Sequence, residues 1–204
     1  MIDPRFIYLA VLLAALGGYS YVRDTWRGVT SPNRVTWSLW GLEGVLAFCV
    51  EIQQHVGLAS LMTLMLGLVP LVVVAVSFKN PHSVWRLGPF DIVCGAISLA
   101  GLAFWAFVNE PTIALVSFVC ADQVAGLPTI RKSWLAPLTE SPRVFILGCF
   151  NCTITILTLK VFTTAGALFP GCVIVADAVM SLLIVGRLGP RFRHEPGVVK
   201  EAAA

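Results

Sequence analysis

Three acidic residues lie inside long apolar stretches of this sequence, where an acidic side chain is costly. Glu43, Asp122 and Asp177 each stand near the middle of such a stretch. An acid near the centre of a bilayer costs about 2.5 to 3.5 kcal/mol on insertion scales, so we expect all three to face the interior of a helical bundle. The basic residues stand at the ends of the stretches. The pattern predicts binding of protons or of a cationic group; the structural alternative is a protonated acid in an interhelical hydrogen bond.

A polar helix face accompanies the first acid. Thr36 and Trp40 precede Glu43 by seven and three residues, so the three side chains share one face of a helix. Trp40, beside polar neighbours, is placed to stack on a sugar or a heteroaromatic ring. We expect Trp37 to act instead as an anchor at the membrane surface, because it lies close to the end of the stretch.

A second polar face begins at Asn151. Thr155 and Thr158 follow it at helical spacing, and this face suits either ligand contact or hydrogen bonds between helices. Cys149 and Cys152 flank Asn151 with a spacing used in redox and zinc sites, but they lie in an apolar stretch without a second cysteine pair. We therefore expect them to pack, and we expect neither a metal nor a cofactor.

The composition places these faces in a membrane. Hydrophobic residues make up 57% of the chain and charged residues 12%, with a mean hydropathy of +0.85, whereas soluble domains are roughly 45 to 50% apolar. The loops are short, and no Ser/His, paired-Asp or HExxH pattern appears, so we expect no soluble catalytic domain and no enzyme. Spanning a bilayer takes about 20 mostly apolar residues, and seven stretches qualify: Phe6–Val22, Val35–Gln53, Gly57–Phe78, Pro89–Val108, Thr112–Ile130, Val144–Phe162 and Ala167–Arg187.

Basic residues are distributed unequally between the two sides. With seven spans, the first, third and fifth loops and the C-terminus share a side that carries 12 Lys and Arg residues, against Arg5 and Lys160 on the other. Because Lys and Arg collect in cytoplasmic loops, the N-terminus is predicted to lie outside and the C-terminus inside an inner or plasma membrane. Contact with anionic lipid accounts for the net charge of +3, so no nucleic acid partner is expected.

One phrase of the sequence occurs twice. The segment GYSYVRDTWRGVTSPNRV begins at Gly18, and GLPTIRKSWLAPLTESPRV begins at Gly126, an offset of 108 residues. We therefore expect an all-α membrane protein built as two three-helix repeats, residues 1–80 and 111–190, joined by a linker helix in 81–110 and followed by a cytoplasmic tail, 191–204. Three spans reverse the side of the chain, so the linker helix makes the repeats parallel. A binding cavity is expected where they face each other.

Seven spans, an outer N-terminus, the three-one-three order and LPTIRKSW at the inner end of the fifth span together resemble the PQ-loop/MtN3 superfamily. That superfamily includes the SWEET and SemiSWEET sugar transporters and the KDEL receptor. Where its members carry Pro-Gln, this chain has Pro128 and Thr129, and the first copy has Ser20 and Tyr21. The segment WSLWG, which begins at Trp37, is also similar to Trp-rich vitamin carriers of the PnuC type.

The resemblance implies a transporter of a small polar solute, sugar-like or vitamin-like, that works by alternating access. Asp122, Asp177, Glu43, Asn151 and Trp40 are the expected substrate-binding residues. Pro128 lacks an N–H and loosens its helix, which suits a hinge, although membrane helices also tolerate proline without moving. The alternative is a seven-helix receptor or cargo-binding protein without transport. Solute identity, proton coupling and assembly into a homo-oligomer stay open.

Overall fold

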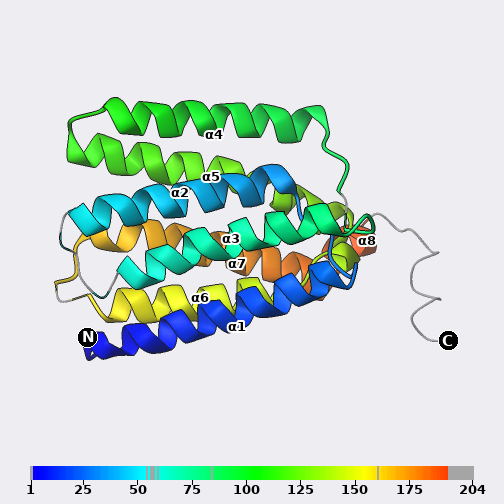
Figure 1. The fold of residues 1–204 in the computed structure, drawn as a ribbon, viewed down its shortest axis with the longest axis horizontal. Helices are drawn as coiled ribbons and strands as arrows, with labels where there is room; N and C mark the ends of the chain where they lie inside the picture. The colour runs from blue at the N-terminus through cyan, green and yellow to red at the C-terminus, as the bar shows by residue number, and fades with distance from the viewer. Residues whose placement is uncertain are drawn as a thin grey trace.

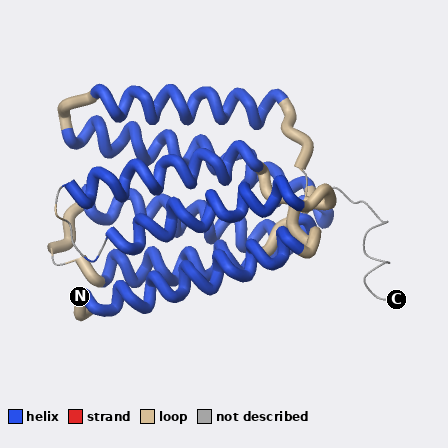
Figure 2. The backbone as a smooth tube through the Cα atoms, viewed as in Figure 1, coloured by secondary structure: helices blue, strands red, loops and turns tan. Residues whose placement is uncertain are grey.

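The protein is a bundle of helices that run side by side along its length (Figures 1 and 2). The computed structural model describes residues 2–53, 55, 58, 60–83, 85–159 and 161–192, and that part of the chain contains no strand. The long helices are α1 (Ile7–Trp26), α2 (Arg34–Gln53), α3 (Ser60–Lys79), α4 (Pro89–Phe107), α5 (Pro111–Leu135), α6 (Pro142–Leu157) and α7 (Thr164–Gly186). The short ones are η1 (Pro4–Phe6), η3 (Pro137–Thr139) and α8 (Leu188–Phe192).

Within the described residues, six helices are long and apolar enough to cross a membrane, which confirms the prediction of an all-α membrane protein. The helix α6 is apolar but has 16 residues, about 24 Å at 1.5 Å per residue, against a hydrocarbon core of about 30 Å. The predicted stretch here ran to Phe162, whereas the helix ends at Leu157. The hydroxyl of Thr158, the residue that caps this end, donates to the carbonyl oxygen of Thr155, a local bond that competes with helix continuation.

Proline sets the start of several helices. The helices α4, α5 and α6 each begin with a proline, a residue that suits the first helical position because the N–H there has no partner within the helix. At α5 the preceding Glu110 supplies the cap: its carboxylate accepts from the backbone N–H groups of Ile113 at 2.6 Å and Thr112 at 3.1 Å. These bonds hold the pKa of Glu110 below its usual value.

The helices pack in a pattern that occurs twice. The helix α3 packs against both α1 and α2, and α7 packs against both α5 and α6. Across the middle of the bundle, α1 contacts α6 and α2 contacts α5. The helix α4 lies at the edge of the bundle, along α5 and part of α2 (Figure 1). Every helix that later contributes to the candidate site is therefore held by at least two neighbours.

Small residues bring α2 and α3 into close contact. A Cβ atom added to Gly44 would collide with the backbone of Gly67, and a Cβ added to Gly67 would collide with the backbone of Gly44 and Val45. One turn away, a Cβ on Gly41 would lie 2.6 Å from a methyl carbon of Leu71. Glycine lets helix backbones approach in this way in membranes, where dispersion contacts drive association. The two helices thus form a tightly packed pair.

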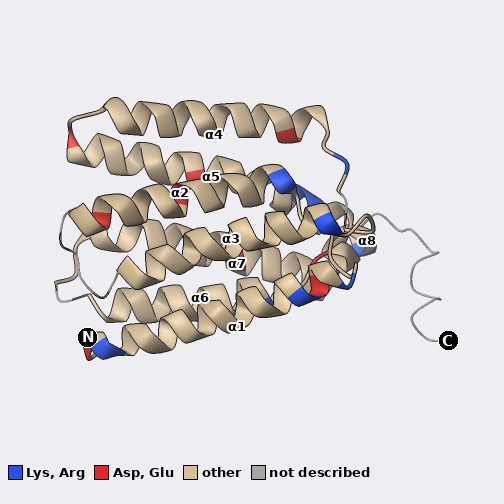
Figure 3. Cartoon of the chain, viewed as in Figure 1, with Lys and Arg blue, Asp and Glu red and all other residues tan. Residues whose placement is uncertain are grey.

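Lys and Arg residues gather at one end of the bundle (Figure 3). This end, called the basic end below, carries α8 and the loops that join α1 to α2, α3 to α4, and α5 to α6. The long helical segments between the two ends contain few charged residues (Figure 3). Lys and Arg are therefore distributed unequally between the two ends of the described bundle.

A buried ion pair joins several segments at the basic end. Lys132 of α5 lies 2.7 Å from a carboxylate oxygen of Glu140, and neither side chain is exposed. The Lys132 ammonium also donates to the backbone carbonyl oxygens of Ser31 and Thr139. The hydroxyl of Tyr21, on α1, donates to the other Glu140 oxygen at 2.6 Å. Tyr21, Lys132 and Glu140, called the clamp below, thus connect α1, α5 and two loops.

Breaking the clamp should destabilise the protein strongly. Replacing Lys132 with Met leaves the Glu140 carboxylate buried without its cation, which costs about 3 to 5 kcal/mol in comparable buried pairs. Thermal unfolding in detergent should therefore begin at a much lower temperature for Lys132→Met. The double variant Lys132→Met/Glu140→Gln should recover most of the loss, because no charge stays buried and Tyr21 keeps an acceptor. Lys79→Met, at an exposed lysine, should change the unfolding free energy by less than about 0.5 kcal/mol; equal effects of the two single variants would contradict this account.

Candidate functional site

A partly open cavity of about 120 Å³ lies where six of the long helices meet. It is similar in size to a 150 Å³ cavity that can hold a benzene-sized molecule. All five predicted substrate-binding residues line it, from four different helices: Trp40 and Glu43 from α2, Asp122 from α5, Asn151 from α6 and Asp177 from α7. The fold thus brings together residues that are up to 137 positions apart in the sequence, since Trp40 and Asp177 face one space.

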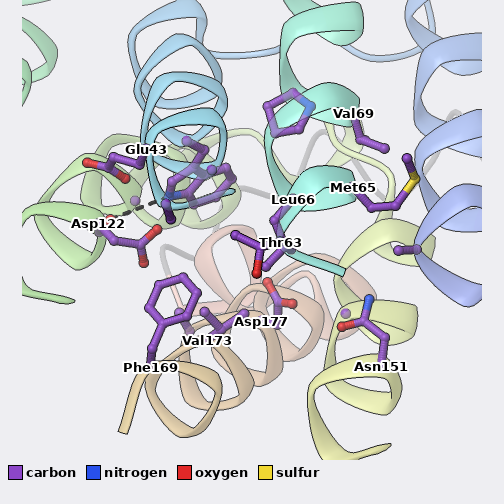
Figure 4. Close-up of a pocket in the computed structure, with 18 of the residues that line it drawn as sticks. Glu43, Thr63, Met65, Leu66, Val69, Asp122, Asn151, Phe169, Val173 and Asp177 are labelled. Carbon is purple, nitrogen blue, oxygen red and sulfur yellow. Dashed lines mark hydrogen bonds between the residues drawn. The ribbon is translucent and has the colours of Figure 1, made fainter. Parts of the chain in front are cut away.

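The cavity lining is mostly apolar, with a few polar groups. Figure 4 shows Glu43 and Asp122 on one side, Asn151 on the other, and Thr63 and Asp177 between them. Among the described residues, the lining contains no Lys, Arg or His side chain. Its remaining members are Ala14, Trp37, Gly44, Ala47, Met65, Leu66, Val69, Pro70, Phe118, Gln123, Gly126, Val144, Phe145, Gly148, Phe169, Val173 and Ala176.

Glu43 and Asp122 both line the cavity, and Glu43 is incompletely hydrogen-bonded. The hydroxyl of Ser98, on α4, donates to one Glu43 oxygen at 3.1 Å, and the side-chain amide of Gln123 donates to Asp122 at 2.8 Å. The second Glu43 oxygen is buried and has no hydrogen-bond partner. Glu43 is 1% exposed. A buried acceptor without a donor costs about 1 to 3 kcal/mol. A further hydrogen-bond donor at this oxygen of Glu43 would therefore be stabilising.

Trp40 is fixed between α2 and α5. Its indole N–H donates to the backbone carbonyl oxygen of Asp122 at 3.4 Å. The ring lies against Gly126, where an added Cβ would come within 3.2 Å of a ring carbon. Trp40 therefore holds Asp122 in place as well as lining the cavity, a positioning role that the sequence did not reveal.

Asp177 and Asn151 line the part of the cavity that α6 and α7 form. The Asp177 carboxylate lies directly over Gly148 of α6, so that a Cβ added to Gly148 would collide with it. Asn151 is 3% exposed, and its side-chain oxygen has no hydrogen-bond partner. The predicted polar face beyond Asn151 does not reach the cavity: the Thr155 hydroxyl donates to the Asn151 carbonyl oxygen, within α6 itself. The Thr155 hydroxyl therefore neither lines the cavity nor bonds to another helix.

A layer of aromatic side chains separates the cavity from the clamp. Tyr21 and Trp37 lie with ring centroids 4.3 Å apart, and Phe145 lies 6.5 Å from each of them. The prediction that Trp37 anchors at the membrane surface is wrong, because the side chain is 2% exposed and packs in this cluster. Helical spacing alone does not reveal which face a neighbouring helix covers, and α1 and α6 cover this one.

Pro128 lies outside the cavity lining. It is buried in α5, which continues through it to Leu135. Because proline has no N–H, the carbonyl oxygen of Val124 loses its usual helical donor at this point. Pro128 stands one turn before Lys132 of the clamp. Its role as a hinge stays a prediction.

Several polar residues of the site were not predicted from the sequence. Gln123 and Thr63 line the cavity, Ser98 reaches Glu43 from α4, and the clamp lies beneath the aromatic layer. Gln123 could have been predicted, because it is a polar residue directly after Asp122 in an apolar stretch. Cys149 and Cys152 are free thiols, and the described residues contain no group of three or more His, Cys, Asp or Glu side chains placed to hold a metal ion.

Comparison of the chain with protein-family models, with curated proteins and with solved structures gave no match. The resemblance to the PQ-loop/MtN3 superfamily therefore stays a prediction from the sequence.

The close contact between Asp177 and Gly148 can be tested with two glycine variants. Gly148→Ala places a methyl group against the Asp177 carboxylate and should lower the unfolding free energy by about 1 to 3 kcal/mol, the usual cost of overpacking. Gly171→Ala, in α7, is the matched control, because an added Cβ there meets no atom within 4 Å. Combining Gly148→Ala with Asp177→Ala should restore stability; thermal unfolding in detergent measures all three. Equal stability of Gly148→Ala and Gly171→Ala would refute the contact.

Proposed function

We propose that this protein is an integral membrane transporter that moves a small polar solute by alternating access. The observation that carries the proposal is the partly polar cavity between α1–α3 on one side and α5–α7 on the other, lined by three carboxyl groups and Asn151. Acidic and amide groups at this depth are costly in a bilayer, and in membrane proteins they usually mark substrate or proton pathways.

The helix contacts support two parallel three-helix repeats with α4 as the linker. If α1, α2 and α3 correspond to α5, α6 and α7, each internal contact of one unit has its counterpart in the other. The contacts between units, α1 with α6 and α2 with α5, also exchange under this correspondence. Ala14 and Asp122, separated by the same 108 residues as the two copies of the repeated phrase, both line the cavity. Such repeats commonly bind solute at their interface and rock against each other.

The charges support one orientation. Lys and Arg gather at the basic end (Figure 3), and this end is cytoplasmic if the positive-inside rule holds. The N-terminus would then lie outside, in an inner or plasma membrane. In this orientation the clamp and the aromatic layer close the cavity toward the cytoplasm, and release of solute to that side requires both to separate. The PQ-loop resemblance fits this mechanism and favours a sugar-like or vitamin-like solute.

Uptake into liposomes tests the transport proposal. Purified protein should take up at least one of labelled glucose, ribose, pantothenate or nicotinamide with saturable kinetics. Asp122→Asn should reduce that uptake about tenfold, the effect of losing a charged hydrogen bond of about 1.5 kcal/mol. Glu110→Gln is the control, because Glu110 is an exposed residue at the start of α5, and it should transport normally.

The same preparation distinguishes a transporter from a receptor that binds its ligand without moving it. A solute that raises the melting temperature without entering the liposomes would favour the receptor alternative. If no solute of the panel either binds or enters the liposomes, that result would count against a carrier of these solutes.

A further inference from the structure

The cavity has an unbalanced charge. Glu43, Asp122 and Asp177 all line it, and within the described part of the chain no basic side chain does. The three are 1%, 8% and 9% exposed. Removing a carboxylate from water costs several kcal/mol unless a positive charge or a proton compensates it. The chain supplies a cation to the buried Glu140, and it supplies none to the cavity.

Among the described residues of the cavity lining, three side-chain atoms are buried without a hydrogen-bond partner. One is the indole N–H of Trp37, a donor, whose ring packs in the aromatic layer. The other two are acceptors: the second carboxyl oxygen of Glu43 and the side-chain oxygen of Asn151, whose side chain is almost completely buried and directed into the cavity (Figure 4). A carboxylate accepts and does not donate, whereas an ammonium group donates and does not accept. An ammonium group therefore donates to both acceptors, on Glu43 and Asn151, and also compensates the negative charge of the carboxylates.

Aromatic rings complete the surroundings that a small organic cation prefers. Trp40, Phe118 and Phe169 line the cavity. The rings of Phe118 and Phe169 have centroids 5.4 Å apart. The face of an aromatic ring attracts a cation, and this attraction strengthens when the pair is shielded from water. Carboxylates and aromatic faces together select a positively charged group on an apolar body.

We propose that the cavity binds a small organic ammonium ion, with Glu43, Asp122, Asp177 and Asn151 around the charged group and the aromatic rings against its apolar part. This inference rests on the proposed function and narrows the solute to a cation. Neutral solutes of the same shape bind much more weakly, because they leave the carboxyl groups uncompensated.

The test compares an ammonium ion with its neutral counterpart. tert-Butylammonium and tert-butanol have the same shape and differ in charge. Thermal unfolding of the purified full-length protein is measured at pH 7.5 in a neutral detergent with rising concentrations of each, at an ionic strength kept constant with sodium chloride. We expect tert-butylammonium to raise the melting temperature saturably, by about 3 °C or more at ten times its Kd. tert-Butanol and sodium chloride should produce no saturable rise.

Variants then locate the site. Asp177→Asn removes one charge with little change of shape and should weaken binding of tert-butylammonium at least tenfold. If that variant does not fold, Asn151→Leu and Asp122→Asn serve the same purpose. Glu110→Gln, outside the cavity, should bind as the unchanged protein does. No saturable rise with the ammonium ion, an equal rise with tert-butanol, or binding unaffected by every cavity variant would each overturn the inference.

Failure of the cation inference and failure of the transport proposal give different results. Exchange of labelled tert-butylammonium across liposomes is measured beside that of the neutral solutes glucose, ribose and nicotinamide. Saturable binding of the cation without exchange leaves the cation site standing and removes transport. Exchange of a neutral solute, with no response to the cation, leaves transport standing and overturns the cation site.

Discussion

A carboxylate that is taken out of water must receive a positive charge or a proton, and this constraint organises the molecule. At the basic end the chain meets it internally: Lys132 compensates Glu140, and Tyr21 completes the hydrogen bonding. In the cavity, Glu43 has a hydroxyl donor and Asp122 an amide donor, but no basic side chain among the described residues lines the space. The clamp therefore binds the protein's own segments together, whereas the cavity is suited to a group from outside.

The two sites are connected through packed rings. Tyr21 belongs to both, because its hydroxyl bonds Glu140 while its ring lies on Trp37. Trp37 in turn contacts Trp40, at a centroid distance of 5.7 Å, and Trp40 holds the backbone of Asp122. The clamp and the cavity are therefore joined by a continuous series of packed side chains.

The membrane fold and the acids of the cavity were predictable from the sequence for a physical reason. An acid in a long apolar helix has no favourable position except the interior, so Asp122 and Asp177 had to converge. The burial of Lys132 was not predictable, because a lysine at a helix end ordinarily extends into water, and its partner Glu140 is placed by the turn after α5. The prediction for Trp37 was wrong for a related reason. Its position along α2 indicated that it lies close to the membrane surface, whereas its burial depends on the packing of α1 and α6 against it.

The helix that links the two three-helix units has a consequence of its own. The helix α4 lies outside the cavity, yet its Ser98 supplies a hydrogen bond to Glu43. Near its start, Asp91 accepts a hydrogen bond at 2.9 Å from Asn33, in the loop between α1 and α2. The connector between the two three-helix units is therefore fastened to the first unit at two levels, beside the cavity through Ser98 and at the basic end through Asp91.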